Sequence, residues 1–121
     1  MTMQTSKKRS SEPIFWSLFG AGGVIVAFVL PVAIIVTGIA VPMGLFPAEV
    51  MSYERALAFA GNWMGKLSLL VIISLTLWHA VHRIYLSLHD LGIQRRGIYK
   101  WLCYGSAFAG TAATALLLLQ I

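Results

Sequence analysis

Three histidines and an arginine stand at the end of an apolar segment, "LWHAVHRIYLSLHD", residues 77–90. His82 and His89 are seven residues apart, so in a helix they share one face. His79 and Arg83 are four apart and share a neighbouring face. Imidazole takes up or releases a proton near neutral pH, and a guanidinium stabilises negative charge that develops on an oxygen. Beside lipid, these groups suit a ligand that is part apolar and part polar, such as a quinone.

Other interpretations of the same stretch remain open from the residues alone. At a membrane surface, Arg83 can extend its guanidinium to the headgroups, and the histidines can complement the negative end of a helix. Imidazole is also an axial ligand of haem iron. His79 is the deepest candidate for that role, and the second ligand would have to come from another chain. A small transporter normally carries ionisable groups within its spans, but the acidic residues here lie outside the apolar runs: Glu12, Glu49, Glu54 and Asp90.

The composition indicates a membrane protein. Of the 121 residues, 59% are hydrophobic and only 11% are charged, whereas soluble domains carry roughly a quarter charged residues. The net charge of +5 favours anionic headgroups or an acidic protein face over nucleic acid, because the basic groups flank apolar segments. Cys103 is the only cysteine, which excludes a disulfide within the chain and a thiolate metal cluster.

Three apolar runs are each long enough to cross a bilayer, which takes about 20 residues as a helix. They predict spans over residues 15–41, 64–88 and 99–121. We therefore expect an all-α membrane protein, with a polar tail over residues 1–14 and one three-helix domain over residues 15–121. Residues 53–66, which precede the second span, fit either an interfacial helix or the beginning of that span.

Basic residues predict the orientation of the spans. Two groups lie before the first run and between the second and third, and the loop between the first two runs is poorer in them. By the positive-inside rule the N-terminus lies in the cytoplasm and the C-terminus on the opposite, periplasmic side. Trp16, at the start of the first span, then lies at the same surface as the histidines. The two basic groups are Lys7, Lys8 and Arg9, and Arg95, Arg96 and Lys100.

Small residues recur at helical spacing in the first and third spans, where they allow close helix packing. Such faces can pack on each other within the chain or on a partner. The predicted packing residues are Gly20, Gly23 and Ala27 in the first span, and Gly105, Ala109 and Ala113 in the third.

Four blocks of the chain, "RSSEPIFWSLFGAGG", "GLFP", "SYERALAFA" and "HRIYLSLHDLGI", resemble the fumarate reductase D-subunit family of gamma-proteobacteria. The resemblance covers roughly residues 7–121. It implies a membrane anchor without a catalytic site in the bacterial inner membrane. Its partners would be a flavoprotein subunit, an iron–sulfur subunit and a second anchor, the C-subunit, in a complex that passes electrons from menaquinol to fumarate in anaerobic respiration.

The resemblance also implies where menaquinone binds. Trp16, His82 and Arg83 match family positions that border the quinone site, and His79 is a further candidate. Haem, FAD and iron–sulfur clusters are not expected in this chain. The alternatives are a haem b-binding anchor of a succinate dehydrogenase-type complex, a small transporter or an assembly protein.

Overall fold

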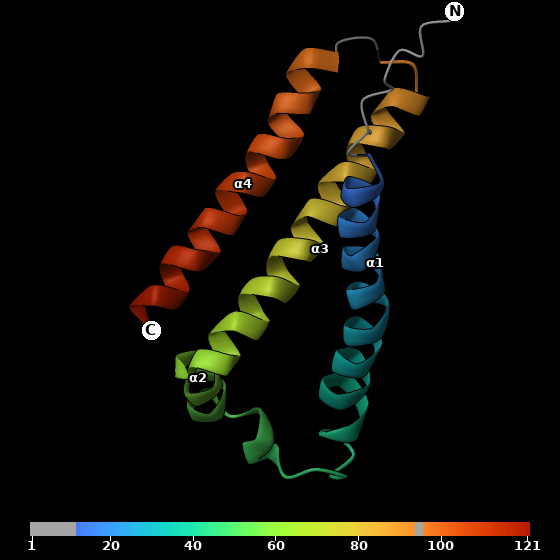
Figure 1. Cartoon of the computed structure of the whole chain (residues 1–121). Coiled ribbons are helices and arrows are strands. Elements are labelled where there is room, and N and C mark those ends of the chain that lie inside the picture. The colour runs from blue at the N-terminus through green and yellow to red at the C-terminus, as the bar shows by residue number, and fades with distance from the viewer. Residues whose placement is uncertain (1–11, 94–95) are drawn as a thin grey trace, which may run out of the picture.

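The computed structural model describes residues 12–93 and 96–121, and this part of the chain is helical without a strand (Figure 1). The predicted all-α class is thus confirmed. The basic residues 7–9 and Arg95 lie outside the described residues. The elements are α1 (Glu12–Ile35), a π-helical turn η1 (Val36–Ala40), a 3-10 helix η2 (Ala48–Met51), α2 (Tyr53–Gly61), α3 (Trp63–Asp90) and α4 (Arg96–Gln120).

Three of these segments are long and apolar enough to span a membrane: Pro13–Ala40, Trp63–Asp90 and Gly97–Gln120. They agree with the predicted spans to within a few residues. The first helix begins at Glu12, three residues before the predicted span. Pro13 suits this position, because its fixed φ favours the first helical turn and its missing N–H would have no partner there. The α-helix continues past Pro31 to Ile35 before it widens into η1.

The long helices form an open bundle in which α3 lies between α1 and α4 (Figure 1). Each outer helix packs mainly against α3. The arrangement places the N-terminal end of α1 beside the C-terminal end of α3. The small-residue faces of the first and third spans therefore do not form the main contact with each other.

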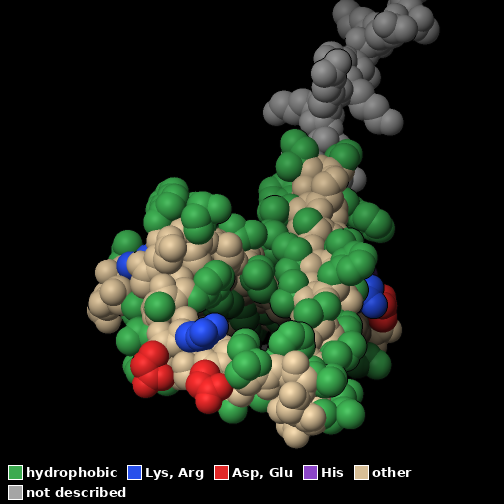
Figure 2. Space-filling model, turned by 90° about the horizontal axis from the view of Figure 1, so that it is seen from below, with side chains coloured by type: hydrophobic (Ala, Val, Ile, Leu, Met, Phe, Trp, Pro, Cys, Tyr) green, Lys and Arg blue, Asp and Glu red, His purple; other side chains and the backbone are tan. Residues whose placement is uncertain are grey.

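Many large apolar side chains are exposed on the surface of the described chain, and Figure 2 shows such side chains over much of one face. Ala40, Ala107 and Leu118 are the hydrophobic side chains that the described residues bury. In water such a surface would drive aggregation, whereas in a bilayer the same side chains face hydrocarbon. The loops and α2 carry charged groups at one end of the bundle, which Figure 2 shows in the foreground.

Residues 53–66 contain a separate helix and the start of the second span. Ser52 caps α2, as its Oγ accepts a hydrogen bond from the Arg55 N–H at 3.4 Å. Asn62 then takes an extended conformation with ψ 139° and caps α3 through Met64 N–H at 3.1 Å. Gly65 allows the sharp turn, because a Cβ there would overlap the carbonyl oxygen of Phe59.

Candidate functional site

A shallow hollow forms where the first turns of α1 meet the last turns of α3. Its volume is about 140 Å³. The four ligand-binding residues predicted from the sequence all line this hollow: Trp16, His79, His82 and Arg83. Along the chain, Trp16 is 63 or more residues away from the other three. The lining residues are Trp16, Phe19, Gly20, His79, His82, Arg83 and Leu86.

His82 is held by residues from two other helices. Its Nδ1 lies 2.8 Å from the hydroxyl of Tyr104 on α4. On its other side the ring of Phe19 on α1 stacks nearly parallel, with ring centroids 4.1 Å apart and planes at 6°. A half-buried imidazole with one nitrogen bonded and one face covered has little rotational freedom. Nε2 is the polar atom that remains to meet a ligand.

His79 on α3 forms a hydrogen bond to the backbone of α1. Its Nδ1 lies 2.7 Å from the carbonyl oxygen of Phe19. Because a carbonyl can only accept, Nδ1 carries the hydrogen and donates it. The edge of the imidazole faces Gly23, where a Cβ would stand 2.7 Å from Cε1 of the ring. His79 therefore lines the hollow and also joins the two helices.

Two adjacent glycines allow this close approach. A Cβ on Gly22 would overlap the carbonyl oxygen of Leu75 and stand 2.7 Å from Cβ of His79. Gly23 accommodates the imidazole ring, whereas a Cβ on Gly20 would meet nothing within 4 Å among the described residues. Of the first predicted stripe, Gly23 thus packs within the chain, while Gly20 and Ala27 are exposed.

The other predicted packing face points away from α3. Gly105, Ala109 and Ala113 are exposed in this chain. The face of α4 that packs on α3 instead carries Tyr104, Ala107, Thr111 and Leu118, spaced in steps of three, four and seven. Whether the exposed small residues meet a partner stays a prediction.

An aromatic cluster supports the hollow from the side of α4. Tyr104 packs against Trp78 and Tyr85, with ring centroids 6.1 and 5.6 Å apart. Trp78 also donates a hydrogen bond from Nε1 to Thr111 Oγ1 at 3.1 Å. Tyr104 and Phe19 were not predicted from the sequence. No local pattern marks them, because their contacts with His82 join different helices.

The polar side of the hollow is open. Trp16 is 79% exposed, and Arg83 is exposed and forms no ion pair with another described residue. A guanidinium near lipid needs headgroups, water or an anionic or carbonyl partner. The hollow thus offers an open arginine, one fixed imidazole and a flat indole to a ligand that approaches from outside the chain.

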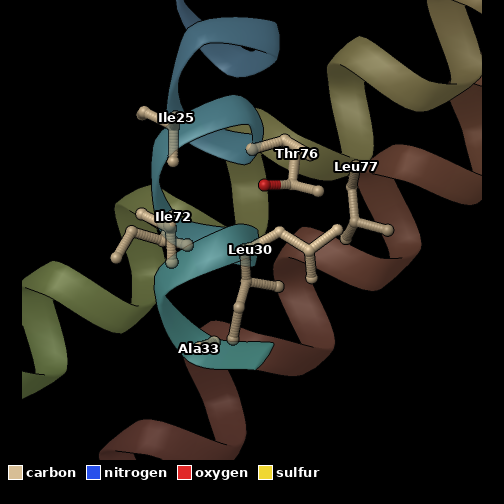
Figure 3. A pocket seen from close by; sticks show the side chains of 9 residues that line it. Ile25, Leu30, Ala33, Ile72, Thr76 and Leu77 are labelled. Carbon is tan, nitrogen blue, oxygen red and sulfur yellow. The ribbon is translucent and has the colours of Figure 1, made fainter. Parts of the chain in front are cut away.

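A larger groove between α1 and α3 has a different character (Figure 3). Its volume is about 360 Å³, and Thr76 is the one residue with a polar side chain in its lining. It offers contacts for hydrocarbon and no group for proton or electron chemistry. The lining residues are Ile25, Val26, Val29, Leu30, Ala33, Ile72, Ile73, Thr76 and Leu77.

No group of three or more His, Cys, Asp or Glu side chains among residues 12–93 and 96–121 is arranged to hold a metal ion. The histidines of the hollow are engaged with a tyrosine and a backbone carbonyl. In both histidines the nitrogen that forms this hydrogen bond is Nδ1.

Comparison with known proteins gives a consistent result over nearly the whole chain. Residues 6–119 match the family described as the D-subunit of fumarate reductase. The fumarate reductase D-subunit of Vibrio parahaemolyticus is 45% identical, and the match covers 99% of this chain and 96% of that protein. The protein of the same name from Photobacterium profundum is 41% identical, with 94% and 95% covered.

Proposed function

The chain belongs to the fumarate reductase D-subunit family, and we propose that it is the non-catalytic anchor of a quinol:fumarate reductase in the bacterial inner membrane. Its three apolar spans provide the attachment. The partners of this proposal are a flavoprotein subunit, an iron–sulfur subunit and a second anchor, the C-subunit. The exposed apolar side chains support this proposal, because a bundle of only three helices leaves much of each helix free to contact lipid and a second anchor.

The hollow between α1 and α3 is the proposed menaquinone site. The observation that carries this proposal is the convergence of Trp16, His82 and Arg83 on one cavity. The donor set fits a quinone headgroup. An imidazole N–H and a guanidinium can donate to its carbonyl oxygens, and an indole gives a flat wall for its ring.

The hollow is only part of a complete site. Its volume of about 140 Å³ is below the roughly 300–1,000 Å³ of typical ligand pockets. Its open side would therefore be closed by partner subunits, which could add further donors. This agrees with the exposure of Trp16 and Arg83 in the isolated chain.

Each residue has a defined task in this proposal. Menaquinone, when bound, supplies the two-electron chemistry and carries the protons. His82 donates from Nε2 to a ligand oxygen, and Arg83 favours negative charge on that oxygen. Trp16 covers the ring and limits access of water from the membrane surface.

The position of His79 supports a quinone over haem. An axial histidine needs its free nitrogen directed at iron in the middle of a wide, flat macrocycle. The imidazole edge of His79, including Nε2, faces the backbone of α1, since Nε2 is 3.2 Å from a Cβ built on Gly23. A porphyrin bound at this atom would have to enter the close α1–α3 contact at Gly23.

The distribution of acids also favours an anchor over a transporter. Glu49 lies in η2 and Glu54 in α2, and Asp90 is the last residue of α3. None lies in the middle of a span, where a carboxylate would couple to a proton or a cation.

Two assays of one complex test the quinone site. His82→Ala or Arg83→Leu should slow fumarate reduction by menaquinol by roughly tenfold or more, because loss of a donor to a charged oxygen costs up to about a hundredfold. Fumarate reduction by reduced viologen should be unchanged, since viologen bypasses the quinone.

His89→Ala is the matched control. This exposed histidine lies seven residues further along α3 and does not line the hollow. It should leave both activities at the wild-type level. Equal losses in both assays for the His82 and Arg83 variants would indicate failed assembly, and unchanged menaquinol activity would refute the quinone site.

A further inference from the structure

Tyr104 makes a contact with the site although it does not line the hollow. Its hydroxyl lies 2.8 Å from Nδ1 of His82, across the α3–α4 interface. The tyrosine is half-buried. Among the described residues, this nitrogen is the one hydrogen-bond partner of the hydroxyl.

The direction of this hydrogen bond follows from what each group can donate. If Nδ1 donated, the hydroxyl hydrogen of Tyr104 would have no acceptor among the described residues at the α3–α4 interface, whereas a hydrogen on Nε2 of His82 can meet a ligand in the open hollow. A polar hydrogen without a partner is unfavourable at a half-buried position within a membrane span. The hydroxyl therefore donates to Nδ1, and the single hydrogen of neutral His82 lies on Nε2.

We propose that Tyr104 is a positioning residue of the quinone site, which holds His82 in the form that presents an Nε2–H donor to the ligand. This inference rests on the proposed menaquinone site. Phe19 covers one face of the same imidazole, so orientation and tautomer are both set by neighbours. Tyr104 has no contact with the ligand in this account and acts only through His82.

The hydroxyl and the ring of Tyr104 have different tasks, and this makes the inference testable. The ring packs against Trp78 and Tyr85 and so supports the fold. Tyr104→Phe keeps the ring and removes the hydroxyl. Tyr85→Phe is the matched control, because it removes a hydroxyl from the same cluster that forms no hydrogen bond to His82.

The first measurement is binding of menadione to the assembled complex by equilibrium dialysis. Tyr104→Phe should raise the dissociation constant about two- to tenfold, the usual range for one hydrogen bond. Tyr85→Phe should leave it unchanged. Reduction of fumarate by viologen, measured on the same preparations, should match the wild type and so confirm assembly. Equal weakening by both substitutions, or none by Tyr104→Phe, overturns the inference.

A double-mutant cycle then asks whether Tyr104 acts through His82. His82→Ala alone should weaken menadione binding, and adding Tyr104→Phe to it should weaken binding no further. Additive losses would mean that Tyr104 acts on its own, which overturns the positioning role but not the quinone site. If His82→Ala leaves menadione binding unchanged, the proposed site itself fails, and the inference with it.

Discussion

At the scale of single residues, the environment of each histidine decides what it can do. His79 and His82 are three positions apart on α3, yet one donates to a backbone carbonyl of α1 and the other meets a tyrosine of α4. His89, seven positions after His82, is exposed near the end of the helix. Three imidazoles of one segment therefore have three different surroundings: a backbone carbonyl of α1, a tyrosine of α4 and an exposed position near the end of α3.

A hydrogen bond between side chains of α3 and α4 provides a prediction at the same scale. Thr111→Val removes the acceptor of Trp78 Nε1 while keeping the shape of the side chain. Hydrogen bonds between membrane helices contribute about 0.6 kcal/mol on average, so the assembled complex should unfold at a slightly lower detergent concentration. The measurement is a denaturation curve in sodium dodecyl sulfate. In the Trp78→Phe background, where the donor is already absent, Thr111→Val should have little further effect, and fully additive effects would contradict the bond.

At the scale of helices, contact between α1 and α3 depends on backbones that approach closely. Gly22 and Gly23 meet Leu75 and His79 at distances that exclude a Cβ. Small residues at such points increase van der Waals contact between helices, which replaces the hydrophobic effect as the driving force within lipid. The same contact places Trp16 of α1 beside the end of α3, so the candidate site depends on it.

Three glycines of α1 offer a graded test of this contact. Gly22→Leu and Gly23→Leu should push α1 away from α3, at a cost of at least about 1–3 kcal/mol from overpacking. The soluble subunits should then be released from membranes while viologen-driven activity in solution persists. The measurement is the distribution of that activity between membranes and supernatant.

Gly20→Leu is the control within the same helix, since Gly20 has open space around it in this chain. The soluble subunits should stay on the membrane in this variant if their attachment depends on the α1–α3 contact and not on the surface around Gly20. Release by Gly20→Leu as well would place a partner on that side of α1. Full retention with Gly22→Leu would contradict the close contact itself.

At the scale of the whole molecule, two features concern its surroundings: its orientation in the membrane and the exposed small-residue face of α4. We predict that the N-terminus and the loop after α3 are cytoplasmic. Alkaline phosphatase, which is active only outside the cytoplasm, should be active when fused after Ile121 and inactive when fused after Gly92. The reverse pattern in fusions that insert normally would overturn the orientation.

The exposed face of Gly105, Ala109 and Ala113 predicts a contact with the second anchor. Ala109→Leu should reduce co-purification of that anchor, because a large side chain keeps the helices apart. Ala109→Ser retains a small side chain and should leave the complex intact. If Ala109→Leu co-purifies the second anchor at the wild-type level, this face meets lipid instead.

The sequence by itself determined the class, the three spans and most of the candidate site. Hydropathy over about 20 residues identifies a membrane helix without any knowledge of its neighbours. The family resemblance, which is read from the sequence alone, points to Trp16, His82 and Arg83. Three antiparallel spans also require that the start of the first lies near the end of the second. These properties depend on composition and on positions along single helices, which the order of residues encodes directly.

Only the tertiary structure decided how the helices meet. The rotation of each helix about its axis places Gly22 rather than Gly20 at the contact and turns Gly105, Ala109 and Ala113 outward. It also brings Phe19 and Tyr104 to His82. In a chain whose helices are apolar on most sides, no amphipathic stripe marks the inner face. Steric fit between backbones selects it, and that fit exists only once the helices are packed together.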